Sequence, residues 1–187
     1  MRRRSRRRAS TVAALGIDEG PTFTKLRVSR GGPEVIEVGA RLGGGYDAEL
    51  VRLVTGVDLN ELALAAALGE TLTARDLVAP GGAPVGGAAV RFLISPPGRL
   101  ESVQVPQGLR GVVSTRVYRD PGHVFGRFRR AADRAGAVLA VGAAPADALA
   151  RAEDAAERIR FVTADSPALS RGSRQAAAVA DVRAAPS

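Results

Sequence analysis

The residues of this chain best suited to chemistry lie together at positions 35–45, in the stretch VIEVGARLGGG. Glu37 sits between two apolar residues, Arg41 follows four positions later, and three consecutive glycines come next. A carboxylate on an apolar strand is costly unless it is paired or holds a cation. A guanidinium group binds phosphate or carboxylate oxygens, and glycines let backbone N–H groups approach an anion closely. Together these groups are suited to hold a metal–phosphate or an acyl phosphate.

The same residues also have an ordinary interpretation, and composition alone does not decide against it. Glu37 can simply face solvent, Arg41 can pair with it, and the glycines can be only a turn. Other chemistries are excluded more firmly. The chain has no Cys and one His, His123, so thiolate metal sites, cysteine nucleophiles and multi-histidine metal sites cannot exist.

A β-hairpin is expected to position these residues. Positions 22–28 and 34–38 have the pattern of strands, and a five-residue stretch containing two glycines separates them. If the turn is centred near Gly31, Lys25 lies directly opposite Glu37.

The rest of the chain predicts an α+β fold in which hairpins outnumber strand–helix–strand units. Helical patterns at 46–54 and 59–68 follow the hairpin, and short strands with one main helix at 145–158 follow a Gly- and Pro-rich stretch. We therefore predict a first lobe made of the hairpin and helices, then a small domain of short antiparallel strands and one main helix. The expected segments are a disordered Arg-rich tail (1–10), the first lobe (11–77), a linker (78–87), a small α+β domain (88–165) and a frayed tail (166–187).

Most of the positive charge lies in the first residues. The net charge is +8, and removing the six Arg of residues 2–8 leaves +2. Such a tail is either an arm that binds an anionic partner or an unstructured start of the chain. We favour the unstructured start, because a run of arginines alone is a weak signal. Nucleic acid is therefore not an expected partner. No run of 18 apolar residues and no apolar stretch after the arginines is present, so we expect a cytoplasmic protein without a membrane segment or secretory signal.

Several pieces, in their order, resemble the C-terminal portion of an ATP-grasp carboxylate–amine ligase, of the L-amino acid ligase and carboxylase-like branch. In that family a strand with a metal-binding Glu leads to an Arg and a glycine-rich loop, as in VIEVGARLGGG, and a helix start like Gly-Val-Asp-Leu at 56–59 follows. The later stretches AVRFLISPPGRLESV and DRAGAVLAVGAAPADALARAEDAAERIRF resemble the small C-terminal domain. The resemblance covers roughly residues 11–163.

This resemblance implies a ligase that joins a carboxylate to an amine through an acyl phosphate, using ATP and magnesium. By similarity, Glu37 would ligate magnesium, and Arg41 would be the catalytic residue that neutralises the transferring phosphoryl group. Gly43, Gly44 and Gly45 would contact the substrate or the acyl phosphate.

Two departures from the family pattern shape the expectations. Where the family has a second acid, in a Gly-Pro-x-x-x-Glu setting, this chain has Lys25, and a lysine there pairs with Glu37 and repels magnesium. The ATP-binding lobe that precedes this portion in the family has no counterpart in the sequence. We therefore expect a truncated enzyme, inactive unless a separate N-terminal half or a homo-oligomer completes it. The alternative is a non-catalytic interaction module with an Arg-rich arm for an anionic partner.

Overall fold

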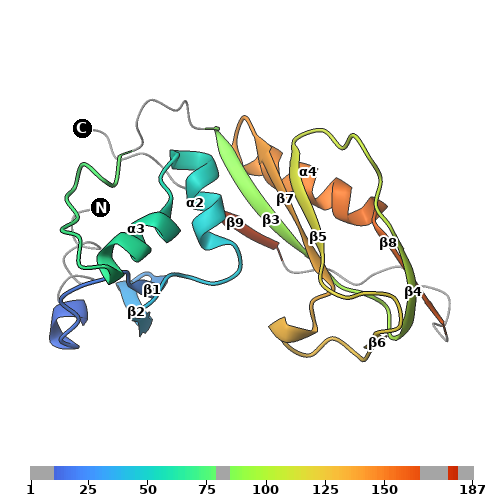
Figure 1. The fold of residues 1–187 in the computed structure, drawn as a ribbon, viewed down its shortest axis with the longest axis horizontal. Coiled ribbons are helices and arrows are strands. Elements are labelled where there is room, and N and C mark those ends of the chain that lie inside the picture. The colour runs from blue at the N-terminus through green and yellow to red at the C-terminus, as the bar shows by residue number, and fades with distance from the viewer. Residues whose placement is uncertain (1–10, 79–84, 165–176, 181–187) are drawn as a thin grey trace. The chain divides into compact units, whose positions relative to one another are not determined.

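The computed structural model describes residues 11–78, 85–164 and 177–180 (Figure 1). The Arg-rich tail, most of the predicted linker and most of the predicted frayed tail lie outside these ranges. The chain divides into two compact units, Met1–Gly82 and Ala83–Ser187, and each is described by itself. The α+β class with antiparallel strands and few helices is confirmed. In the described ranges, none of the helices has the length and apolar character needed to cross a membrane.

The first unit contains the predicted hairpin, formed by β1 (Phe23–Ser29) and β2 (Gly32–Gly39). The turn is tighter than the five residues expected, because Ser29 already pairs with Gly32. Gly32 has φ 107°, a value that glycine adopts at no steric cost, so β2 can begin directly after the turn. A register shift follows Lys25, which pairs with Glu37 while its neighbour Leu26 pairs with Val35. This bulge reconciles the short turn with the predicted opposition of positions 25 and 37.

Two helices follow the hairpin, as predicted. Gly56 ends α2 (Asp47–Thr55) in the left-handed conformation, with φ 78°. Asp58 caps α3 (Leu59–Ala67) by accepting hydrogen bonds from the backbone N–H groups of Asn60 and Glu61 at 2.9 and 3.2 Å. α2 has three buried residues, Ala48, Leu50 and Val54, whereas α3 has none.

The second unit consists of two antiparallel sheets and one long helix. A four-stranded sheet has the order β5-β7-β3-β9 and a three-stranded sheet the order β6-β4-β8. The strands are β3 (Gly87–Leu93), β4 (Gly98–Gln104), β5 (Val112–Val117), β6 (Val124–Phe125), β7 (Gly136–Gly142), β8 (Arg160–Ala164) and β9 (Ala177–Ala180). A single 3-10 turn, Ala131–Asp133, precedes β7. Helix α4 (Pro145–Arg158) packs against β3 and β7 (Figure 1).

Strand β9 was not expected, because it falls within the predicted frayed tail. It pairs antiparallel with β3, where Ala177 lies opposite Arg91 and Ala180 opposite Ala88. Its sequence, AAVA, has weak strand character of its own. The unpaired backbone groups along the edge of β3 supply the partner that local sequence cannot indicate.

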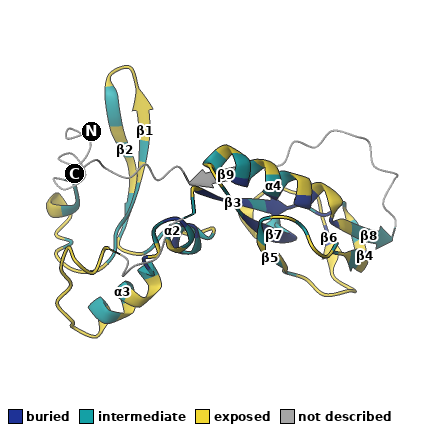
Figure 2. Ribbon diagram, turned by 90° about the horizontal axis from the view of Figure 1, so that it is seen from above, coloured by how far each residue is buried: buried dark blue, intermediate teal, exposed yellow. Residues whose placement is uncertain are grey.

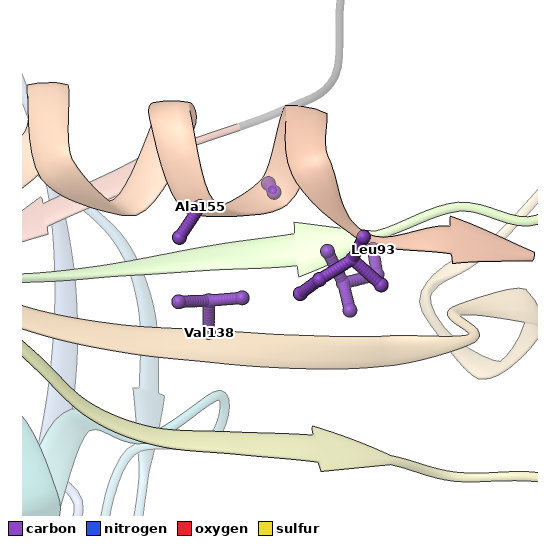
Figure 3. Packing of buried hydrophobic residues seen from close by; sticks show 5 residues of the cluster. Leu93, Val138 and Ala155 are labelled. Carbon is purple, nitrogen blue, oxygen red and sulfur yellow. The ribbon is translucent and has the colours of Figure 1, made fainter. Parts of the chain in front are cut away.

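Alanines allow α4 to approach the sheet closely. Ala89 and Ala140 of the sheet meet Ala148 and Ala152 of the helix, all with no exposed surface. The larger side chains gather toward the end of the helix, where Leu93, Val138, Ala155, Ala156 and Ile159 form one buried cluster (Figures 2 and 3). Burial in the second unit is therefore concentrated between β3, β7 and α4.

Asp147 fixes the start of α4 to the end of β7. Its carboxylate accepts hydrogen bonds from the backbone N–H of Ala143 and from Nε of Arg151, both at 2.9 Å. Arg151 also donates from Nη1 to the carbonyl oxygen of Val141 at 3.0 Å. The backbone N–H of Ala143, followed by the positive charge of Arg151, lowers the pKa of Asp147.

This arrangement predicts an acid-dependent contribution to stability. Because the folded-state pKa of Asp147 lies below its unfolded value of 3.8, the contribution is complete above that value and disappears as the pH falls through the folded pKa. We expect Asp147→Asn to lower the melting temperature at pH 7 and to match the wild type at strongly acidic pH. Thermal unfolding from pH 7 to 2 measures this. A deficit that stays constant over that range would show that the charge of Asp147 is not responsible.

Candidate functional site

Glu37 lies on the exposed face of the hairpin, with half of its side chain accessible. Its register partner is Lys25, as the sequence predicted. Its ion-pair partner is Arg41, whose Nη2 is 3.7 Å from Oε1 of Glu37. Glu37 thus faces solvent between two cations. The free-energy cost of burying its carboxylate, which the apolar strand sequence suggested, does not arise.

The charges on this face form two cross-strand pairs. Lys25 lies opposite Glu37, and Arg27 lies opposite Glu34; all four residues are exposed. Figure 2 shows exposed residues on both strands of the hairpin. Side chains alternate between the two faces of a strand, so the half-buried Leu26 belongs to the other side. Opposite charges in facing positions favour this register modestly.

Arg41 lies across the end of the hairpin. Its guanidinium carbon is 5.5 Å from the centre of the Phe23 ring. Its Nη1 donates to the carbonyl oxygen of Leu42 at 2.8 Å. A Cβ at Gly39 would lie 3.5 Å from the Arg41 side chain. Phe23 and Gly39 are register partners, and the Arg41 side chain lies over both of them. We call this pair of residues the floor of the site.

The three glycines after Arg41 have different environments. Gly43 is covered, because a Cβ there would overlap the carboxylate of Asp47 and lie 2.9 Å from Cδ2 of Phe23. A Cβ at Gly44 would meet nothing within 4 Å. Gly45, with φ 73°, is left-handed, and so is the next residue, Tyr46, with φ 76°. The loop is therefore packed at its first glycine, open at its second and tightly turned at its third.

Phe23 and Asp47 were missed as members of this site. The register that places Lys25 opposite Glu37 also places Phe23 opposite Gly39, so a signal for Phe23 existed. Asp47 had none, because its contact with Gly43 depends on how the loop turns. Burial raises the pKa of Asp47, and the charge of Glu49 raises it further.

The packing of Gly43 predicts an effect that Gly44 does not share. We expect Gly43→Ala to displace the Asp47 side chain and crowd the Phe23 ring, lowering the stability of the first unit by about 1–3 kcal/mol. Gly44→Ala is the matched control, expected to stay within about 0.5 kcal/mol of wild type. Urea unfolding with backbone NMR shifts of the loop measures both. Equal effects of the two substitutions would contradict the packing described for Gly43.

The remaining chemical candidates do not form a second site. His123 is exposed, and its ring meets the edge of Phe125 at 4.7 Å between centroids. Phe125 is buried, whereas Phe128 is 43% exposed.

The surroundings of Glu37 do not fit a magnesium ion. Magnesium prefers carboxylate, phosphate and water oxygens in octahedral geometry. Glu37 instead has Lys25 opposite it and Arg41 beside it, and both cations repel a dication. No cluster of three His, Asp or Glu side chains suited to a metal occurs within the described ranges. The magnesium role that the resemblance gives Glu37 remains a prediction that this geometry does not support.

Comparison with known proteins identifies the fold. Residues 91–164 match the family model of the L-amino acid ligase C-terminal domain 2. Phosphoribosylglycinamide synthetase from Anaerococcus prevotii aligns with a TM-score of 0.71 and 15% identity, over 82% of this chain and 39% of that one. L-amino acid ligase from Bacillus licheniformis aligns with a TM-score of 0.67 and 24% identity, over 82% of this chain and 38% of that one.

The fold is that of the C-terminal portion of an ATP-grasp ligase. The resemblance stated from the sequence is thereby confirmed. Another solved relative, the biotin carboxylase domain of a 2-oxoglutarate carboxylase from Hydrogenobacter thermophilus, is a dimer in complex with MgADP, ADP and bicarbonate. It aligns with a TM-score of 0.54 and 16% identity, over 75% of this chain and 31% of that one.

A curated relative is also similar in sequence over most of this chain. The uncharacterized protein y4rH of Sinorhizobium fredii (strain NBRC 101917 / NGR234) is 31% identical over 140 residues, which cover 70% of this chain. The aligned region is 27% of that protein. The chain thus spans about a quarter of the curated relative and less than half of each solved relative.

Proposed function

We propose that this chain supplies the C-terminal wall of the acyl-phosphate site in an ATP-dependent carboxylate–amine ligase. The observation that carries the proposal is the placement of Arg41 across Phe23 and Gly39, beside the glycine loop at the end of β2. The match of residues 91–164 to an L-amino acid ligase domain supports an amino acid as the carboxylate substrate.

The proposed reaction has two steps. An oxygen of the substrate carboxylate attacks the γ-phosphorus of ATP, and ADP leaves. The amine then attacks the acyl carbon, and inorganic phosphate leaves. Arg41 would neutralise charge on the transferring phosphoryl group and on the departing phosphate, and backbone N–H groups of residues 43–45 would orient the acyl phosphate.

We propose further that ligation needs the rest of an ATP-grasp fold, in the same or another polypeptide. Apolar side chains of the first unit support this. Leu64 of α3 and Leu68, the residue that follows its last turn, are 62% and 71% exposed. Leu77 and Val78 are 62% and 70% exposed. Apolar surface of this kind marks a place where another surface packs. In this proposal, α3 contacts the remaining part of the ATP-grasp fold.

A chimera tests this function. Residues 11–187 replace the corresponding portion of the Bacillus licheniformis L-amino acid ligase, and ADP formation is measured with pairs of amino acids. We expect amino acid-dependent ADP formation by the chimera and none by the chain alone. Circular dichroism and a cooperative melting transition establish that the chimera is folded.

Each result bears on the proposal differently. Amino acid-dependent ADP formation by the isolated chain would contradict the need for a further lobe. A folded chimera that forms no ADP would overturn the proposed ligase role and would favour the alternative, a non-catalytic binding module.

A further inference from the structure

We infer that the hairpin face binds the phosphoryl group of its ligand without a divalent cation, using the ammonium group of Lys25 where the resemblance expects a second metal-binding acid. The inference rests on the proposed function and concerns the same site. It follows from the misfit between Glu37 and magnesium.

Lys25 and Arg41 flank the same floor of the hairpin. Lys25 and Glu37 form one cross-strand pair, and Phe23 and Gly39 form the next pair on the same face. Successive pairs on one face are about 7 Å apart along a strand. Arg41 lies over the second pair. The flexible four-carbon stem of Lys25 can therefore bring its ammonium group to an anion held by Arg41.

The charge on this face favours an anion over a cation. Glu37 has an ion pair with Arg41 at 3.7 Å, and Lys25 has no ion pair within 4 Å in the described part of the chain. The two cations outnumber the carboxylate between them. A phosphate group would be attracted by both cations, whereas a dication would have to displace Arg41 from Glu37 and would be repelled by Lys25.

The loop beyond Arg41 leaves room for such an anion. The Cβ position of Gly44 is open to 4 Å. The neighbouring acid, Asp47, lies beside Gly43, and its carboxylate is not within 4 Å of the Cβ position of Gly44. The arrangement thus offers two cations and an open loop on one side of the hairpin.

NMR titrations of the full chain test the inference with two probes. Inorganic phosphate is added in the presence of EDTA, and Mn²⁺ is added separately without phosphate. For the wild type we expect phosphate to shift the amide signals of Lys25 and residues 43–45, with the same affinity when Mg²⁺ replaces EDTA. We expect Mn²⁺ to cause no selective broadening at Lys25 or Glu37.

Two charge-reversing variants separate a local from a general effect. Lys25→Glu is expected to weaken phosphate binding at least tenfold and to produce Mn²⁺ broadening at Glu37. Arg27→Glu makes the same change in net charge on the same face, opposite Glu34. We expect it to change phosphate affinity less than twofold.

Three outcomes would overturn the inference. These are selective Mn²⁺ broadening at Glu37 in the wild type, phosphate binding that requires Mg²⁺ or is absent, and equal weakening by the two variants. None of them decides the proposed ligase role, which the activity of the chimera tests separately. An active chimera with a negative phosphate titration would reject the metal-free site alone.

Discussion

Replacing Arg41 by alanine is expected to lower ADP formation by the chimera by about two to three orders of magnitude, because preorganised charge at a transferring phosphoryl group has effects of that size. The fold should not change. The side chain is 58% exposed and its ion pair with Glu37 spans 3.7 Å, so its contribution to stability is that of a surface pair, about 0–1 kcal/mol. Steady-state kinetics and thermal unfolding of the same preparation measure the two effects.

Arg52 offers a matched control for Arg41. It is 64% exposed and has an ion pair with Asp58 at 3.7 Å, but it lies on α2, away from the floor formed by Phe23 and Gly39. Arg52→Ala should leave the activity of the chimera within about twofold of wild type. Arg41→Lys keeps the charge but loses the planar group that lies over Phe23, so we expect an intermediate rate. If Arg41→Ala and Arg52→Ala have equal activity, Arg41 has no part in the reaction.

Leu93→Ala is expected to produce the largest loss of stability, about 3–5 kcal/mol for the second unit. Leu93 is 2% exposed and packs in one cluster with Val138, Ala155 and Ile159, where α4 meets the sheet (Figure 3). Truncation would leave a cavity that the neighbouring backbone of β3 and β7 cannot close. Urea unfolding measures the loss of free energy.

Hydrogen exchange assigns that loss to the second unit. Amide groups of β3, β7 and α4 should lose protection in Leu93→Ala, whereas those of the hairpin should not. Val113→Ala is the control, because Val113 is 50% exposed on β5 and its truncation should cost less than about 0.5 kcal/mol. A cost below about 1 kcal/mol for Leu93→Ala would contradict the central position of this cluster.

Much of the fold was predictable because its causes are local. The pattern at 59–68 predicted a helix, and α3 spans Leu59–Ala67 with Asp58 as its cap. The sequence predicted one main helix at 145–158, and α4 spans Pro145–Arg158 with the proline in its first turn. A turn centred near Gly31 predicted Lys25 opposite Glu37, and the bulge after Lys25 produces this pairing from the tighter turn. Periodicity and turn chemistry act over a few residues, so one sequence is enough to detect them.

The remaining features depend on contacts between segments that local sequence does not relate. The bulge after Lys25 and the two-residue turn arise from the pairing of whole strands. β9 exists because β3 has an open edge to pair with, although its own residues indicate a tail.

The candidate site shows the same division. The sequence by itself determined the types and order of Glu37, Arg41 and the three glycines. The opposition of Lys25 to Glu37, although predicted, depends on the bulge in the paired strands. Only the tertiary structure placed Arg41 over Phe23 and packed Asp47 behind Gly43. The physical reason is that a strand's alternation determines which side chains share a face, whereas the path of a glycine loop depends on what packs against it.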